Sequence, residues 1–167
     1  MRDHIRLPGG RIINDYYRIE APDYVIIHAR FRDGRILMER HYKQCLGRVI
    51  LTSPAGSIDP GETLLKAAKR ELLEETGYAA GQWKYGGAFN VDGTRGICKP
   101  HVFLSENLSI VADPHLDDME NHEIVFLSMD EIISAFQSKD IILIPDLATL
   151  AMVTSSLFAP LFMECFE

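Results

Sequence analysis

The segment from residue 63 to residue 77 constrains this chain most, because it combines a clear helix pattern with a concentration of acid. Its apolar residues recur at helical spacing, at Leu64, Leu65, Ala68 and Leu72. The spacing predicts a helix over Thr63–Thr76, with Gly77 in the position of a C-terminal cap. The acidic residues of this helix therefore occupy defined faces.

Three glutamates share one face of the predicted helix. Glu71, Glu74 and Glu75 lie three and four residues apart, so they repel one another by roughly 0.2–0.5 kcal/mol per pair. They also crowd the C-terminal turns, where the helix dipole disfavours anions. By spacing, Arg70 reaches Glu74, and oxygen-seeking divalent cations such as Mg²⁺ would stabilise the cluster further. The alternative for an isolated E-x-x-E-E pattern is a solvated acidic face.

The residues around the helix distinguish these two alternatives. Gly56 is followed after five residues by Glu62, and after seven more by the run Arg70–Tyr78. This arrangement resembles the Nudix signature, G-x5-E-x7-R-E-U-x-E-E-x-G-U, at all seven fixed positions. Tyr78 stands where the signature has an aliphatic residue. From average residue frequencies, a chance match has odds on the order of 10⁻⁷.

The resemblance implies a fold and a metal site. The fold is α/β (α+β), a Nudix α/β/α sandwich with a mixed sheet, in which the box Gly56–Tyr78 forms a loop, a helix and a loop. The resemblance implies that Glu71 and Glu75 bind the metal, that Glu74 contributes, and that the backbone carbonyl of Ala55 adds a ligand. The expected cofactor is Mg²⁺, with Mn²⁺ as a substitute.

The remaining box residues receive supporting roles from the same resemblance. Arg70 is expected to orient the acidic cluster and to assist catalysis together with Glu74. Gly56, Glu62 and Gly77 are expected to support the loop and the helix end. Such a site would clamp pyrophosphate oxygens, spread the charge of the transition state and acidify an attacking water.

Outside the box, the pattern predicts a single domain over residues 1–167 that begins with a hairpin. The turn signal is Pro8-Gly9-Gly10, between strands at 5–7 and 11–19. Further strands are expected at 24–31, 35–40, 49–52, 83–90 and 100–105. Ser128 and Glu131 predict a capping box for a second helix, and a third is expected over Pro145–Leu157.

Segments throughout the chain resemble ADP-ribose pyrophosphatases, among them residues 5–11, 33–37, 40–43, 124–131 and 146–150. In that family the N-terminal strands, here residues 1–21, exchange between subunits of a homodimer. The resemblance implies that Tyr17 or Tyr16 offers aromatic surface to a base, with ordinary packing as the alternative. Candidates to hold the substrate's phosphates are Arg40, Arg48 and Lys43, and Tyr42 is a further substrate-binding candidate.

Two positions depart from the ADP-ribose pyrophosphatase pattern. Val91 replaces a proline beyond the box, and Thr52 replaces an acid before it. The expected substrate is therefore ADP-ribose or a related nucleotide sugar, with a GDP-sugar as an alternative. The expected products are a nucleoside monophosphate and a sugar phosphate. A non-catalytic nucleotide-sugar sensor is the alternative function, although such sensors often lose box acids and this chain keeps them all.

An acidic segment, Asp117–Glu123, is predicted to form a loop before the second helix. By its place in the related family, Glu120 is the first candidate for the general base or an additional metal ligand, and Asp118 the second. The alternative is a solvated loop. His122 is interpreted as a surface residue of this loop. The six histidines show no metal-ligand spacing, so none receives a role.

Composition narrows the partners. The net charge of −7 disfavours nucleic acid, whose phosphates need basic surface. No apolar run reaches the roughly 20 residues of a membrane helix, and the polar N-terminus does not resemble a signal peptide. We therefore expect a cytoplasmic protein that neither spans nor binds a membrane. Its three scattered cysteines predict neither a disulfide framework nor a zinc site.

Overall fold

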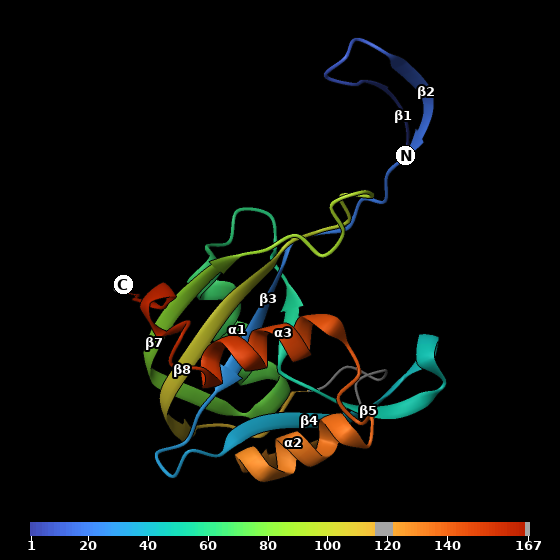
Figure 1. The fold of residues 1–167 in the computed structure, drawn as a ribbon. Helices are drawn as coiled ribbons and strands as arrows, with labels where there is room; N and C mark the ends of the chain where they lie inside the picture. The colour runs from blue at the N-terminus through green and yellow to red at the C-terminus, as the bar shows by residue number, and fades with distance from the viewer. Residues whose placement is uncertain (116–121, 166–167) are drawn as a thin grey trace.

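The computed structural model of the chain describes residues 1–115 and 122–165 (Figure 1). Its largest sheet has five strands in the order β10-β7-β8-β3-β6. Their bounds are β3 Tyr24–Ala29, β6 Ala55–Ser57, β7 Tyr78–Ala88, β8 Pro100–Ile110 and β10 Met163–Glu164. β3 and β8 run parallel, while the other neighbours are antiparallel, so the sheet is mixed as predicted.

A second, three-stranded sheet has the order β5-β4-β9 and is antiparallel throughout. It consists of β4 Ile36–Lys43, β5 Arg48–Thr52 and β9 His122–Leu127, with the 3₁₀ turn Gln44–Leu46 between β4 and β5. Three helices cover the sheets: α1 Leu64–Thr76, α2 Met129–Gln137 and α3 Ile144–Thr154. A 3₁₀ turn at Ala159–Leu161 precedes β10. The mixed α/β architecture agrees with the predicted sandwich.

Two apolar clusters hold these layers together. The first joins α1 to the five-stranded sheet through Ala68, Leu72, Trp83 and Phe103. The second joins the three-stranded sheet to α2 and α3 and is formed by Ile36, Met38, Leu51, Ile132, Ala135, Ile141 and Leu150. Each fully buried aliphatic or aromatic side chain contributes about 1.5–3 kcal/mol of transfer free energy. The apolar face of α1 is thus packed on a rigid sheet, and this packing fixes the position of its acidic face.

The N-terminal hairpin is formed by β1 Arg2–Arg6 and β2 Ile12–Tyr17, which pair in antiparallel fashion as predicted. Gly10 in its turn has a φ of +83°, which glycine adopts without strain. Figure 1 shows the hairpin standing away from the two sheets. Ile12 and Tyr17 are therefore exposed in a single chain.

Other boundaries differ from the prediction. His122 and Glu123 belong to β9 and not to a loop, because they continue the ladder that Ile124–Leu127 form with β4. α3 ends at Thr154 rather than Leu157, since Ser155 takes an extended backbone with ψ of 129°. Among the described residues, no helix has the length and apolar character required to cross a membrane.

Candidate active site

The helix α1 ends at Thr76 as predicted and begins at Leu64, one residue later than predicted, because Thr63 is its N-cap. The Thr63 hydroxyl accepts a hydrogen bond from the Lys66 amide at 3.3 Å and so caps the N-terminus. Gly77 ends the helix in the left-handed region, with φ of +73°. A Cβ there would meet the Ala112 carbonyl oxygen at 2.2 Å. Gly77 therefore ends the helix with a turn and also permits the close approach of Ala112, which follows β8.

Two of the three glutamates on α1 face the short strand β6. The Ala55 amide donates a hydrogen bond to Glu75 Oε2 at 3.0 Å. A Cβ at position 56 would lie 2.0 Å from Glu71 Oε1, so only glycine leaves room for the Glu71 carboxylate. The backbone at Ala55–Gly56 and both carboxylates therefore meet in one small space.

Arg70 organises this space from the same helix. Its guanidinium forms a forked pair with Glu62, at 3.1 Å to Oε1 and 2.9 Å to Oε2, and donates to the Ser57 carbonyl at 3.0 Å. The hydrogen bond from Arg70 holds the pKa of Glu62 below its usual range. Glu62 in turn raises the pKa of Arg70.

Arg70 also contacts two metal-site candidates. Its Nη1 lies 2.8 Å from Glu71 Oε1 and 3.2 Å from Glu74 Oε2. Helical spacing predicts the Glu74 contact alone. The Glu71 contact forms because the side chain of Glu71 turns toward Gly56, into the space that the missing Cβ leaves.

The donor set fits a hard divalent cation. Glu71 and Glu75 have carboxylate oxygens, which are ligands that Mg²⁺ prefers. At Ala55 the observed contact is made by the amide, which donates to Glu75, so the carbonyl of Ala55 as a metal ligand stays a prediction. The absent side chain of Gly56 allows the Glu71 carboxylate to lie against this backbone. Glu74 is more exposed, at 49% for its side chain, and lies on the outer side of Arg70.

A cavity of about 390 Å³ opens beside these carboxylates. This volume lies within the usual range for small-molecule sites, roughly 300–1,000 Å³. Its described lining includes Gly56 and Glu75 from the box, Lys43 as the one lysine or arginine, and Tyr24 as the one aromatic ring other than histidine. The pocket therefore contains one basic side chain, which suits a phosphate, and one flat aromatic ring, which suits a base.

Buried polar side chains form the back wall of the cavity. The His28 ring lies between two hydroxyl groups. Thr149 Oγ1 lies 2.8 Å from His28 Nε2, and Ser53 Oγ lies 3.2 Å from His28 Nδ1. The Ser53 amide donates to Asp146 Oδ1 at 2.7 Å. Burial lowers the pKa of His28 to about 3 and raises that of Asp146 to about 6. This network fixes the strand end that leads to Ala55.

The four substrate-binding candidates lie away from this cavity in a single chain. Arg40 and Tyr42 are exposed, on the opposite face of β4 from the cavity-lining His41 and Lys43. Arg48 pairs with Asp140 at 3.3 Å, also at the surface. Tyr17 lies in the N-terminal hairpin. Their part in substrate binding stays a prediction, and Lys43 is the phosphate candidate that lines the pocket.

The loop candidates Glu120 and Asp118 lie outside the described residues, so their roles also stay predictions. The interpretation of His122 as a surface residue is wrong, because β9 buries its side chain to 2% exposure. Its Nε2 lies 2.8 Å from the Glu75 carbonyl oxygen. His122 therefore contacts the C-terminal turn of the acidic helix.

Sequence analysis did not identify Glu39 and His41, which line the cavity beside Lys43. A signal was present, because residues two apart on a strand share a face. Once Lys43 is a phosphate candidate, the same alternation selects His41 and Glu39 and turns Arg40 outward. The family resemblance selected Arg40 and Tyr42 together with Lys43, but it did not select His41 or Glu39.

Comparison with known proteins agrees with this geometry. The NUDIX domain family matches residues 22–147, which include the box, the three-stranded sheet, the five-stranded sheet except β10, and most of the cavity lining. The chain belongs to the Nudix family. It is therefore an enzyme of the Nudix hydrolase type, a family that generally uses divalent metal ions.

Individual relatives support the same assignment. This Nudix hydrolase is 29% identical over 140 residues to the ADP-ribose pyrophosphatase of Bacillus subtilis (strain 168), covering 83% of this chain and 75% of that protein. It is 32% identical over 138 residues to the putative nudix hydrolase 2 of Caenorhabditis elegans, covering 81% and 57%. A crystal structure of an ADP compounds hydrolase shares its fold, with a TM-score of 0.77 and 21% identity over 90% of this chain and 81% of that one.

Proposed function

We propose that this Nudix hydrolase cleaves the pyrophosphate bond of ADP-ribose or a related nucleoside diphosphate sugar, with Mg²⁺ as its cofactor. The products would be a nucleoside monophosphate and a sugar phosphate. The observation that carries the proposal is the meeting of Glu71, Glu75 and the Ala55–Gly56 backbone beside a cavity that Ala55, Gly56 and Glu75 line. The relationship to an ADP-ribose pyrophosphatase, at 29% identity, supports the substrate class.

The reaction adds one water across one P–O bond. The water oxygen bonds to one phosphorus, the bridging oxygen leaves with the other phosphate, and a carboxylate accepts the water's proton. Glu120 is the first candidate for that base, and Asp118 is the second. When bound, divalent cations neutralise the pyrophosphate and acidify the attacking water.

The chain's own residues hold this arrangement in place. Glu71 and Glu75 would bind the cation, and Glu74 would contribute from the outer side. Arg70 acts as a positioning residue for Glu71 and Glu74, because its fork on Glu62 fixes the guanidinium between them. Lys43 would meet a phosphate oxygen, and Tyr24 would offer a flat surface to a base.

A substrate panel tests the proposal. Purified protein would be incubated with Mg²⁺ or Mn²⁺ and with ADP-ribose, GDP-sugars, other nucleoside diphosphate sugars, dinucleoside polyphosphates and nucleoside triphosphates. We expect the highest kcat/KM for ADP-ribose or a related nucleotide sugar, with one monophosphate and one sugar phosphate as products. Tight binding of one compound without turnover of any would contradict the proposal and favour a sensor.

The proposal includes a homodimer in which the N-terminal strands reach the partner subunit. The exposed Ile12 and Tyr17 and the separation of the hairpin from the sheets support it. Light scattering at micromolar concentration should give twice the chain mass of 18.9 kDa. A monomer under these conditions would contradict the exchanged hairpin.

A further inference from the structure

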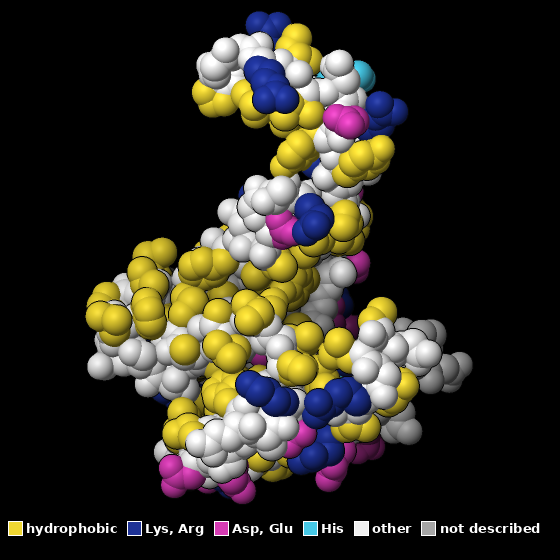
Figure 2. All heavy atoms as spheres, turned by 45° about the vertical axis from the view of Figure 1, so that its right-hand side comes forward, with side chains coloured by type: hydrophobic (Ala, Val, Ile, Leu, Met, Phe, Trp, Pro, Cys, Tyr) yellow, Lys and Arg dark blue, Asp and Glu magenta, His cyan; other side chains and the backbone are white. Residues whose placement is uncertain are grey.

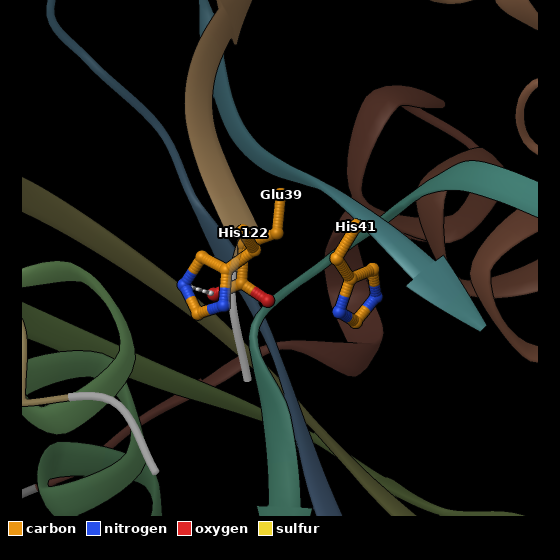
Figure 3. A group of neighbouring side chains, drawn as sticks. All are labelled: Glu39, His41 and His122. Carbon is orange, nitrogen blue, oxygen red and sulfur yellow. Dashed lines mark ion pairs between the residues drawn. The ribbon is translucent and has the colours of Figure 1, made fainter. Parts of the chain in front are cut away.

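Two imidazoles and one carboxylate converge beside the acidic helix, on the cavity face of the three-stranded sheet. His41 of β4 and His122 of β9 are directly opposed partners in the antiparallel ladder. Glu39 precedes His41 by two residues and therefore shares its face. The three residues offer ligand atoms that all lie within 4.8 Å of one another. Figure 3 shows the three side chains turned toward a common point.

We propose that Glu39, His41 and His122 form a binding site for a transition-metal ion of the Zn²⁺ class, separate from the carboxylate site of the Nudix box. Two imidazole nitrogens and one carboxylate oxygen are a common three-ligand set for zinc, with the fourth position left open. Mg²⁺ prefers oxygen ligands throughout, so the two sites differ in the metals they select.

The surroundings of the His41 ring match those of metal-binding histidines. Such rings usually have one nitrogen held by an outer partner, which fixes the tautomer and the ring orientation. His41 Nε2 lies 2.9 Å from Thr52 Oγ1, and His122 Nε2 lies 2.8 Å from the Glu75 carbonyl oxygen. The Thr52 contact assigns metal binding at His41 to Nδ1. At His122 the nitrogen paired with the carboxylate is Nε2, which lies 3.6 Å from Glu39 Oε1 and is joined to it by the dashed line in Figure 3.

Burial makes the arrangement suitable for binding. The side chains of His122 and Glu39 are each 2% exposed, so a metal would be bound by ligands that are already ordered. Burial, with smaller effects of Lys43 and His122, lowers the pKa of His41 to about 4.

The site has an open side toward the substrate cavity. Glu39 and His41 line the cavity together with Glu75 and Lys43. The fourth coordination position of the ion can therefore be reached by water or by a phosphate oxygen. His122 is also in contact with Glu75, so the bound ion would stiffen the link between β9 and the end of α1.

Zinc binding can be measured without any assay of catalysis, so the test is independent of the proposed hydrolysis. The wild-type protein would be titrated with Zn²⁺ against a chromophoric chelator in excess Mg²⁺, with Glu71→Gln as a second protein. We expect one Zn²⁺ per chain in both, since Mg²⁺ and the substitution affect the box alone. No zinc binding by the wild type, or its loss in Glu71→Gln, would overturn the proposal.

Substitutions within the cluster identify the ligands. His41→Gln and His122→Gln should each weaken Zn²⁺ binding by at least about tenfold, because even outer-shell partners cost 10–100-fold. His4→Gln, in the distant hairpin, is the matched control and should bind as the wild type does. Equal binding by all three variants would overturn the proposal. Circular dichroism checks folding, and the half-buried His41 keeps the test valid if His122→Gln does not fold.

Zinc-edge X-ray absorption of the one-to-one complex provides a structural readout. We expect a first shell with two imidazoles, reduced to one in His41→Gln. A shell of oxygen atoms alone would place the ion among the carboxylates of α1 and would contradict the proposal.

Discussion

Gly56 is the residue on which the metal-side geometry depends most. Its missing side chain is the space that the Glu71 carboxylate occupies, at 2.0 Å from where a Cβ would stand. The neighbouring Arg70 then reaches Glu71, a contact that helical spacing alone does not predict. The motif thus specifies the residues, while the contact between helix and strand specifies the arrangement.

Gly56→Ala should displace Glu71 and lower kcat/KM by about 100-fold, the cost of a displacement near 1 Å in a catalytic group. The matched control is Gly93→Ala, where a Cβ would meet nothing within 4 Å. Both would be assayed on the best substrate of the panel, with thermal melts to confirm folding. Wild-type activity in Gly56→Ala would show that Glu71 is not needed in its observed position.

At the scale of elements, the sequence predicts features that depend on neighbouring residues, but it does not predict which distant strands pair. The helix α1, its caps at Thr63 and Gly77 and the capping box of α2 depend on residues a few positions apart. The parallel pairing of β3 with β8 joins residues more than 70 positions apart, and no local pattern specifies it. For the same reason, spacing did not reveal that His41 and His122 meet.

The alternation of side chains along β4 explains why the predicted and observed pocket residues of this strand differ. The resemblance selected Arg40, Tyr42 and Lys43, yet of these only Lys43 lines the cavity, beside His41. One position along a strand reverses the direction of a side chain, so a motif without its register cannot say which neighbour faces the pocket.

The capping box of α2 offers a test at this scale. Ser128 accepts a hydrogen bond from the Glu131 amide, and Glu131 accepts from the Ser128 amide at 2.7 Å. Ser128→Ala should lower the free energy of unfolding by about 1 kcal/mol, which is roughly 2–4 °C in Tm. Ser134→Ala, within the same helix, should change it by less than about 0.5 kcal/mol. Equal effects would show that the cap is not a stability determinant.

For the whole molecule, the surface and the buried network have different roles. Figure 2 shows yellow apolar side chains across the middle of this face, with charged side chains toward the bottom of the view and also on the hairpin at its top. Inside, His28 connects β3 to α3 through Thr149 and to the end of β5 through Ser53. This network joins the layers behind the cavity, so its ionisation affects the stability of the whole fold.

The pH dependence of stability tests this role. Burial lowers the pKa of His28 from 6.5 to about 3, so below pH 6.5 the unfolded chain takes up a proton that the folded chain does not. As the pH falls below 6.5, this group lowers the free energy of unfolding by about 1.4 kcal/mol per pH unit. His28→Gln should be less stable than wild type at pH 7, and that difference should shrink by about 2 kcal/mol at pH 5.

Urea unfolding, followed by the fluorescence of the single tryptophan, Trp83, would measure the difference at both pH values. Asp146 is present in both proteins, so its own titration largely cancels. His4→Gln serves as control and should parallel the wild type. A wild-type-to-variant difference that does not change with pH would contradict this, because it would show that the pKa of His28 is the same in the folded and unfolded chains.

The central claim is that this Nudix hydrolase breaks a pyrophosphate bond through the carboxylates of α1. The most direct measurement is kcat for ADP-ribose with Mg²⁺, compared between wild type and Glu75→Gln, with the products identified. We predict AMP and a sugar phosphate from the wild type, and a kcat lower by about 100-fold or more in a folded Glu75→Gln. Near-normal turnover by the variant, or tight binding without turnover by the wild type, would contradict the account.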